Sequence, residues 1–201
     1  MTVFAGLLES TAIALEYPRE KTAAELTARL PLGGESAAQR GLEEALGALT
    51  DWLKTVDLGA AEERYTQLFD LKPVCTLHVG YQLFGDNYVR GELLAGLAGE
   101  LREAGIEYGH DIPDFLPILL RFIARAPQDD DLATLVHVIV RPGLQKISEA
   151  LAESEGAYPP LLSALAELLD ETIEKPAELA DLIKETPPTL PIYKEAFPCS
   201  M

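Results

Sequence analysis

Apolar residues recur at helical spacing in almost every segment between turn residues, and this periodicity limits the fold more than any other feature. After Ser36, for example, Leu42, Leu46 and Leu49 fall on one side of a predicted helix. Residues 73–84 also alternate as a strand would. Because the chain offers no second strand for this segment to pair with, we expect a helix there. The sequence therefore predicts an all-α, single-domain helical bundle.

Capping residues predict where several of the helices begin. Thr22–Glu25 and Ser36–Gln39 both have the pattern of a capping box, and the first is expected to open a short helix to about Leu30. Asp114 is expected to cap a helix that is apolar nearly all round, which indicates burial on most faces. The pair Pro142-Gly143 is expected to break or kink a later helix.

The centre of the chain, Tyr65–Leu97, is dense in aromatic residues and is interrupted by turns. Gly85 is expected to close one helix in a left-handed conformation, and Asp86 or Asn87 to cap the next, which runs to about Ala104. Glycines inside a helix are costly, so those of this helix suggest that another backbone passes close by: Gly91, Gly96 and Gly99.

The chain has 201 residues, of which 48% are hydrophobic, so it can bury a sizeable core in one domain. We expect an all-helical domain over residues 1–175. The segment 176–201 is rich in proline and is interpreted as a tail, extended or disordered over residues 186–201.

The charge is strongly acidic, with 16 Lys and Arg against 33 Asp and Glu, a net charge of −17. Nucleic acids and anionic membrane surfaces are therefore poor partners. A basic peptide or protein surface is a plausible partner, although acidity can also serve solubility alone. The chain is predicted to be a monomer or a homodimer.

Several features indicate a cytoplasmic protein. The sequence contains only two cysteines, Cys75 and Cys199, and they form no disulfide framework. The first residues lack the basic and apolar regions of a secretory leader. No apolar stretch reaches the roughly 20 residues that span a bilayer, so direct membrane insertion is not expected.

Catalytic motifs give no support for an enzyme. His78, His110 and His137 have no ligand spacing with one another or with the cysteines, so no metal site is predicted. The chain has neither a phosphate-binding glycine loop with a lysine nor a Gly-x-Ser-x-Gly nucleophile motif. We therefore predict no catalytic residue and no cofactor.

Two short patterns follow one another along the centre of the chain. The first is Tyr65-x-x-Leu68-Phe69-Asp70, followed by the run Leu77–Phe84 and by Gly85-Asp86-x-x-x-Arg90-Gly91. The second is Ile112-Pro113-Asp114-Phe115-Leu116-Pro117. In this order and separation they resemble the NarJ/TorD family, whose second element reads Leu-Pro-Asp-His-Leu-Pro. The residues around the first pattern are more similar to those of the family branch that serves heterotrimeric oxidoreductases such as nitrate or selenate reductases.

The resemblance implies a cytoplasmic chaperone for molybdenum enzymes of the dimethyl sulfoxide reductase group, and not a catalyst. Such a chaperone binds the apo catalytic subunit, often through an N-terminal twin-arginine segment. It keeps that subunit competent for insertion of the molybdopterin guanine dinucleotide cofactor before export or membrane assembly. Phe115 stands where the family often has His, so a role carried by that imidazole does not transfer to this chain.

A twin-arginine segment carries positive charge followed by an apolar run, so its receptor needs an apolar groove with acidic edges. Arg90 is expected to pair with Asp86 and order the loop between them. For the aromatic residues, burial in the core is the alternative, and for Asp86 and Asp114 it is helix capping. The predicted client-binding residues are Tyr65, Phe69, Asp70, Tyr81, Phe84, Asp86, Tyr88, Arg90, Asp111, Pro113, Asp114 and Phe115.

Two other functions remain open from the sequence. One is a non-catalytic helical subunit or interaction module that stays permanently in an oxidoreductase complex. The other is a helical enzyme or nucleotide-binding protein, for which no motif in the chain gives a positive signal.

Overall fold

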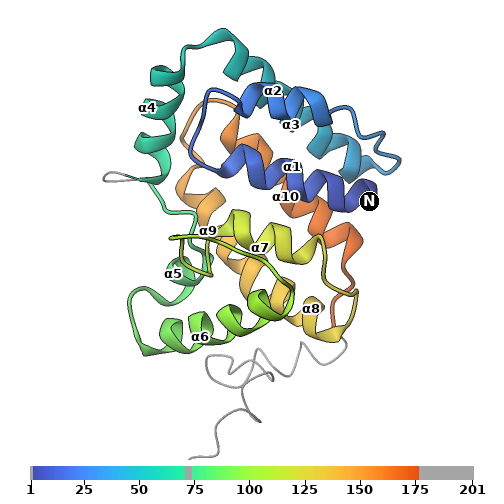
Figure 1. The fold of residues 1–201 in the computed structure, drawn as a ribbon, viewed down its shortest axis with the longest axis vertical. Helices are drawn as coiled ribbons and strands as arrows, with labels where there is room; N and C mark the ends of the chain where they lie inside the picture. Colours follow the sequence, from blue (N-terminus) through green and yellow to red (C-terminus); the bar gives the residue numbers. More distant parts are fainter. Residues whose placement is uncertain (1, 71–73, 177–201) are drawn as a thin grey trace, which may run out of the picture.

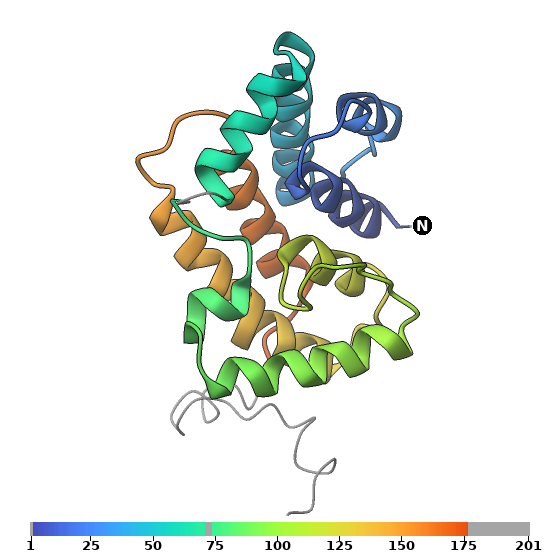
Figure 2. The same cartoon turned by 60° about the vertical axis from the view of Figure 1, so that its left-hand side comes forward.

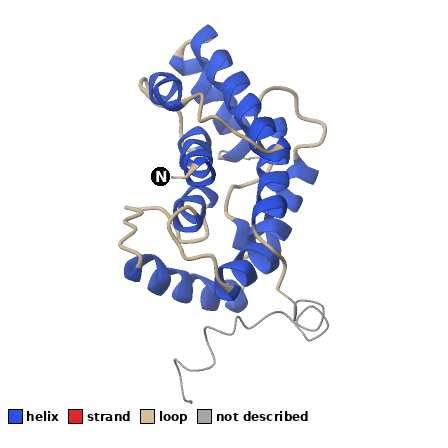
Figure 3. Ribbon diagram, turned by 90° about the vertical axis from the view of Figure 1, so that its right-hand side faces the viewer, coloured by secondary structure: helices blue, strands red, loops and turns tan. Residues whose placement is uncertain are grey.

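The computed structural model describes residues 2–70 and 74–176 of the chain. In the described part, all the regular elements are helices, and loops join them (Figure 3). This confirms the all-α prediction. In chain order the helices are α1 (Val3–Leu15), α2 (Thr22–Arg29), α3 (Ala37–Thr55), α4 (Leu58–Phe69), α5 (Val79–Phe84), α6 (Tyr88–Glu103), α7 (Leu116–Ile123), α8 (Asp130–Thr134), the π-helix η1 (Leu135–Val140), α9 (Arg141–Ala150) and α10 (Tyr158–Thr172).

The molecule has two ends joined by a central group of helices. Figure 1 shows α2, α3 and α4 at one end and α5, α6 and α8 at the other, with α1, α7, α9 and α10 between them. Helix α10 packs against α3 and α9, while α1 packs against α7 and α3. The short helix α5 packs against α9. The central helices therefore link the two ends through continuous side-chain packing.

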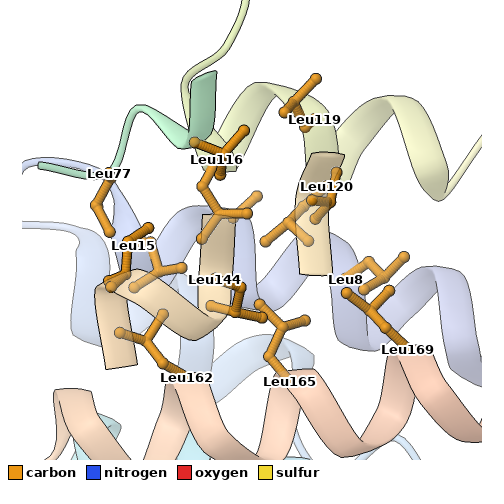
Figure 4. Packing of buried hydrophobic residues seen from close by; sticks show 14 of the residues in the cluster. Leu8, Leu15, Leu77, Leu116, Leu119, Leu120, Leu144, Leu162, Leu165 and Leu169 are labelled. Atoms are coloured by element: carbon orange, nitrogen blue, oxygen red, sulfur yellow. The ribbon is translucent and has the colours of Figure 1, made fainter. Parts of the chain in front are cut away.

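Leucines from the central helices fill the core, as Figure 4 shows. Leu8 of α1, Leu119 of α7, Leu144 of α9 and Leu165 of α10 belong to one cluster and are fully buried. Each buried leucine contributes about 1.5–3 kcal/mol relative to an exposed one. The apolar stripes read from the sequence thus meet in one large hydrophobic cluster, and Leu101, Ile106 and Ile118 form a second, smaller one.

One of the two predicted capping boxes is present. The Gln39 N–H donates to the Ser36 hydroxyl at 3.1 Å, and the Gln39 side chain accepts from the Ser36 N–H at 3.4 Å. The box predicted at Thr22 is wrong, because Thr22 is the first residue inside α2. Its hydroxyl accepts a hydrogen bond from the Arg19 N–H at 2.9 Å, so it closes the preceding turn instead.

The helix predicted over residues 73–84 is much shorter than expected, since only α5 is helical and residues 74–78 are not. The end of α5 is as predicted: Gly85 has a φ of 67°, and its N–H donates to the Tyr81 carbonyl at 2.8 Å. Asn87 caps α6 by accepting a hydrogen bond from the Arg90 N–H at 3.3 Å.

The close backbone approach predicted for the glycines of α6 is wrong for Gly91 and Gly99, where a Cβ atom would meet nothing within 4 Å. Tight contacts occur at other glycines. At Gly143 of α9 a Cβ atom would lie 2.7 Å from the Cβ of Val79. The absence of a side chain at Gly143 therefore allows α5 to lie directly on α9.

Of the break or kink expected at Pro142-Gly143, the break does not occur. Helices α8, η1 and α9 follow one another without interruption, and a π-turn lies directly before the proline. The Arg141 N–H donates to the Val136 carbonyl five residues earlier. A proline has no N–H to donate and its ring needs room against the preceding turn, so the wider π-turn accommodates it within a continuous helix.

Within residues 2–70 and 74–176, no helix is both long and apolar enough to cross a membrane. The predicted tail lies outside the described residues except for its first residue, so the boundary between residues 175 and 176 stays a prediction.

Candidate functional site

Asp114 is a fully buried carboxylate that binds two basic side chains. Its Oδ1 lies 3.0 Å from the Nδ1 of His78. The guanidinium of Arg90 donates from Nε to Oδ2 at 2.9 Å and from Nη2 to Oδ1 at 3.3 Å. The Asp114 side chain is 0% exposed, and that of Arg90 is 11% exposed. We refer to His78, Arg90 and Asp114 as the Asp114 cluster.

Backbone hydrogen bonds hold the cluster in place. The Val79 N–H donates to the Asp114 carbonyl at 3.0 Å, and the Leu116 N–H donates to the Leu77 carbonyl at 2.9 Å. This pairing is an antiparallel β-bridge between His78 and Phe115. The segment before α5 is therefore extended because it pairs with the segment before α7, which explains the short α5.

Gly80 allows the closest approach within the cluster. A Cβ atom at this position would lie 2.7 Å from the Asp114 Oδ2. The first turn of α5 thus passes directly beside the carboxylate, which a larger residue would obstruct. The cluster joins the starts of α5, α6 and α7 at a single point.

The electrostatics of the cluster favour an ionised Asp114. Burial alone raises the pKa of a carboxyl group, but the hydrogen bonds and charges of His78 and Arg90 outweigh burial and hold the pKa of Asp114 below its usual range. A buried carboxylate without such partners would be strongly destabilising. Asp114 therefore contributes a fixed negative charge whose interactions are directed inward.

Aromatic residues surround the cluster. The Arg90 guanidinium lies 5.3 Å from the centre of the Tyr81 ring, a cation–π contact. The His78 ring lies 5.2 Å from that of Phe115. Tyr81 is 44% exposed and Tyr88, at the start of α6, is 80% exposed. Large apolar side chains are thus displayed on the same segments that the cluster joins.

Further residues of these segments add acidic and apolar groups at the surface. Asp86, Asp111 and Ile112 are exposed, while Pro113 and Phe84 are partly buried. Asp70 is exposed at the end of α4. We use the name client-facing surface, after the role predicted from the sequence, for Tyr81, Asp86, Tyr88, Asp111, Ile112 and Phe115.

Two of the predicted groove residues are in the core instead. Tyr65 is 5% exposed and donates its hydroxyl hydrogen to the Leu15 carbonyl at 3.0 Å. Phe69 is 6% exposed and lies 5.2 Å from the Tyr65 ring and 5.3 Å from the Tyr158 ring. Both rings face inward from α4, so they do not line a surface groove with Tyr81.

Two local pairings expected from the sequence are also wrong. Arg90 pairs with Asp114 and not with Asp86, four residues before it. Asp114 does not cap α7, because Phe115 is the N-cap residue and offers no side-chain hydrogen bond there. The long-range pairing prevails because it neutralises a buried charge, whereas an exposed pair on a helix contributes only about 0.3–0.5 kcal/mol.

Sequence reasoning missed His78 and Gly80. The signal for His78 was present, since a histidine within an apolar run needs a polar partner when that run is buried. Its partner lies 36 residues away, beyond the reach of any local pattern. Among the described residues, no group of three or more acidic, histidine or cysteine side chains is arranged to hold a metal ion.

Two surface pockets described in the structure lie away from the predicted residues. The first has a volume of about 340 Å³ and lies at the start of α10, and the second, of about 280 Å³, lies between α2 and α3. None of the predicted client-binding residues lines either pocket. The apolar groove at the client-facing surface therefore remains a prediction.

The fold is similar to that of a solved protein. A solved structure of a putative redox enzyme maturation protein from Archaeoglobus fulgidus superposes with a TM-score of 0.59, covering 83% of this chain and 93% of that chain. The sequence identity is 19%, so this likeness shows the fold alone. The described helices thus share the overall arrangement of that solved structure.

The family follows from the sequence match. The family model for the nitrate reductase delta subunit matches residues 35–175, which include both central patterns. The chain therefore belongs to the nitrate reductase delta subunit family, and the resemblance to NarJ and TorD is confirmed.

Two curated relatives illustrate the match. The nitrate reductase molybdenum cofactor assembly chaperone NarJ of Escherichia coli K12 is 28% identical over 148 residues, or 72% of this chain and 62% of that protein. The nitrate reductase-like protein NarX of Mycobacterium tuberculosis H37Rv is 31% identical over 120 residues, or 58% of this chain and 17% of that protein. The chain thus spans less than two thirds of the length of these relatives.

Proposed function

We propose that this chain is a cytoplasmic maturation chaperone for the catalytic subunit of a molybdenum oxidoreductase of the nitrate reductase kind. It binds the apo subunit, keeps it competent for cofactor insertion and carries out no reaction of its own. The observation that carries this proposal is the family match over residues 35–175. One relative of the chain is named as an assembly chaperone.

The client-facing surface supplies the chemistry for binding. A twin-arginine segment of the client would place its cations near Asp86 and Asp111 and its apolar run against Tyr81, Tyr88 and Ile112. The net charge of −17 attracts such a segment from a distance. Both exposed tyrosines belong to a residue type that often carries the binding energy of an interface.

Asp114 has a different part in this proposal from the one expected of an exposed acid. Its carboxylate is already bound to His78 and Arg90, so it does not meet a client arginine directly. It holds the segments that carry the client-facing surface in one arrangement, and binding is stronger when that arrangement exists beforehand.

Calorimetry with the apo catalytic subunit and with its N-terminal peptide tests the proposal. We expect Tyr81→Ala and Tyr88→Ala each to weaken binding about tenfold, because each removes about 1–2 kcal/mol of interface contact. Tyr17→Ala is the matched control, since Tyr17 is 45% exposed but lies outside the client-facing surface. If the unaltered chain binds neither the subunit nor the peptide, the proposed function is wrong.

A second candidate is a permanent, non-catalytic subunit, which the description of the family as a delta subunit favours. The two candidates differ in when the chain leaves its client. A chaperone is absent from the cofactor-loaded enzyme, whereas a permanent subunit co-purifies with it in constant stoichiometry. Purification of the mature enzyme from cells that also express a tagged form of this chain distinguishes them.

A further inference from the structure

A pocket lies at the start of α10, and none of its lining residues belongs to the client-facing surface. Figures 1 and 2 show the start of α10 well separated from α6. Its volume of about 340 Å³ is that of a small-molecule site. The loop that precedes α10 passes beside α4, as Figure 2 shows, and Arg64 of α4 donates a hydrogen bond to the Glu155 carbonyl in that loop. The residues that line the pocket are Trp52, Arg64, Glu155, Gly156, Ala157 and Tyr158.

Tyr158 brings a hydroxyl group that makes no hydrogen bond within the part of the chain that the structure describes and is not among its fully buried atoms, so it is open to the pocket. Its side chain is 2% exposed, yet it lines the pocket. Burial raises the pKa of Tyr158, so its hydroxyl keeps the proton and acts as a donor. Because this hydroxyl is open to the pocket and has no protein partner there, it can donate to a ligand in the pocket.

The other polar features of the pocket also favour negative charge. Arg64 is partly buried, and its bond to the Glu155 carbonyl leaves other donors of the guanidinium free for a ligand. Its charge acts on the Tyr158 hydroxyl, whose pKa it draws downward against the effect of burial. The start of α10, a helix of 15 residues, adds the positive end of its dipole at Ala157 and Tyr158. The exposed Glu155 is the one acidic side chain in the lining.

Aromatic rings form the apolar part of the pocket. The rings of Trp52 and Tyr158 lie 6.3 Å apart at an angle of 70°, an edge-to-face arrangement. The Tyr158 ring also packs edge-to-face against the Phe69 ring, with 5.3 Å between the ring centres. A planar ring is therefore complementary to the wall, while its charged substituent can reach Arg64.

We propose that this pocket binds a small organic anion, in which a planar ring carries a carboxylate or phosphate group. The ring packs against Trp52, and the anionic group accepts hydrogen bonds from Arg64 and the Tyr158 hydroxyl. This site is independent of client binding, because its residues are separate from the client-facing surface.

Titration with benzoate, phenyl phosphate and the neutral benzamide tests the proposal. Trp52 is the only tryptophan of the chain, so its indole N–H resonance reports directly on the pocket. We expect saturable shifts with at least one of the two anions and at least about tenfold weaker binding of benzamide, which lacks the charge. The stronger of the two anions identifies the anionic group as carboxylate or phosphate.

Substitutions distinguish anion binding in the pocket from general effects of removing a charge elsewhere on the protein. Arg64→Gln is expected to weaken anion binding about tenfold, and Tyr158→Phe, which keeps the aromatic packing, about fivefold. Arg40→Gln is the matched control, because Arg40 also donates to a backbone carbonyl, that of Glu35, but lies outside the pocket. Equal binding of the anions and benzamide, no shift with either anion, or unchanged binding in both pocket variants overturns the proposal.

Discussion

At the scale of single residues, Asp114 connects three segments that are distant in the chain. His78 lies 36 residues before it and Arg90 lies 24 residues before it. A carboxylate with no exposure is tolerated only when donors and opposite charges surround it. The same contacts that satisfy this charge therefore fix the relative positions of α5, α6 and α7.

We predict that Asp114→Asn lowers the free energy of unfolding by about 3 kcal/mol, because it leaves the buried Arg90 without its counter-charge. Urea denaturation at neutral pH measures this loss. Asp170→Asn is the control, since the pair of Asp170 with Arg141 is more exposed and its loss is expected to cost less than about 1 kcal/mol.

The pH dependence of the Asp114 variant provides a second check. The pKa of Asp114 is lowered by folding, so its stabilisation is complete above about pH 4 and is lost as the pH falls through the folded-state pKa. The difference between the unaltered chain and Asp114→Asn should shrink on acidification. A difference that stays constant, or that does not exceed the Asp170→Asn effect at neutral pH, contradicts the assigned role.

At the scale of elements, the packing of α5 on α9 determines where α5, the shortest of the helices that carry the site, is positioned. Helix α5 has six residues, too few to be stable by itself. It is held by Val79 packing onto Gly143 and by the hydrogen bond from the Val79 N–H to the Asp114 carbonyl. Its helical state is thus a consequence of tertiary packing.

Gly143→Ala is predicted to destabilise the protein, although alanine is the better helix former. The new Cβ would lie 2.7 Å from the Val79 Cβ and 3.1 Å from the Val79 carbonyl oxygen. Overpacking of about 1–3 kcal/mol exceeds the gain of about 1 kcal/mol from helix propensity. Thermal unfolding followed by circular dichroism gives the sign of the change.

Gly99→Ala in α6 is the matched control for this prediction. A Cβ atom at Gly99 meets nothing within 4 Å, so only the helix propensity changes and the protein should become more stable by about 0.5–1 kcal/mol. Stabilisation by both substitutions would mean that α5 does not depend on the close approach at Gly143.

At the scale of the whole molecule, negative charge is the dominant surface property. The net charge of −17 acts against compactness through repulsion between like charges. Ion pairs such as Arg121 of α7 with Glu16, and Arg125 with Glu9 of α1, offset part of this repulsion. The proposed attraction of basic client segments and the repulsion within the chain thus have the same origin, the net negative charge.

We predict that added sodium chloride raises the melting temperature at neutral pH by a few degrees, because screening weakens the repulsion more than it weakens exposed ion pairs. Thermal unfolding at low and at physiological ionic strength measures the effect. It should disappear near the isoelectric point of about 4.5, where the net charge is close to zero. A melting temperature that falls with salt at neutral pH would show that ion pairs dominate.

The sequence by itself determined the class of the fold, the positions of most helices and the family. These depend on local physics: the Ser36 cap, the left-handed Gly85 and the Asn87 cap act within a few residues of their position in the chain. Leucines at helical spacing likewise predict which helix faces are buried. Each of these signals can be read without knowing which helices meet.

Only the tertiary structure decided how the candidate site is built. It placed Tyr65 in the core and Tyr81 at the surface, and it gave Arg90 the partner Asp114 in place of Asp86. Helical periodicity marks an aromatic residue as inward-facing or outward-facing only when the position of the neighbouring helix is known. Leaving a buried charge without its partner costs far more than losing an exposed local pair, and the bridge between the segments before α5 and α7 brings Asp114 beside α5.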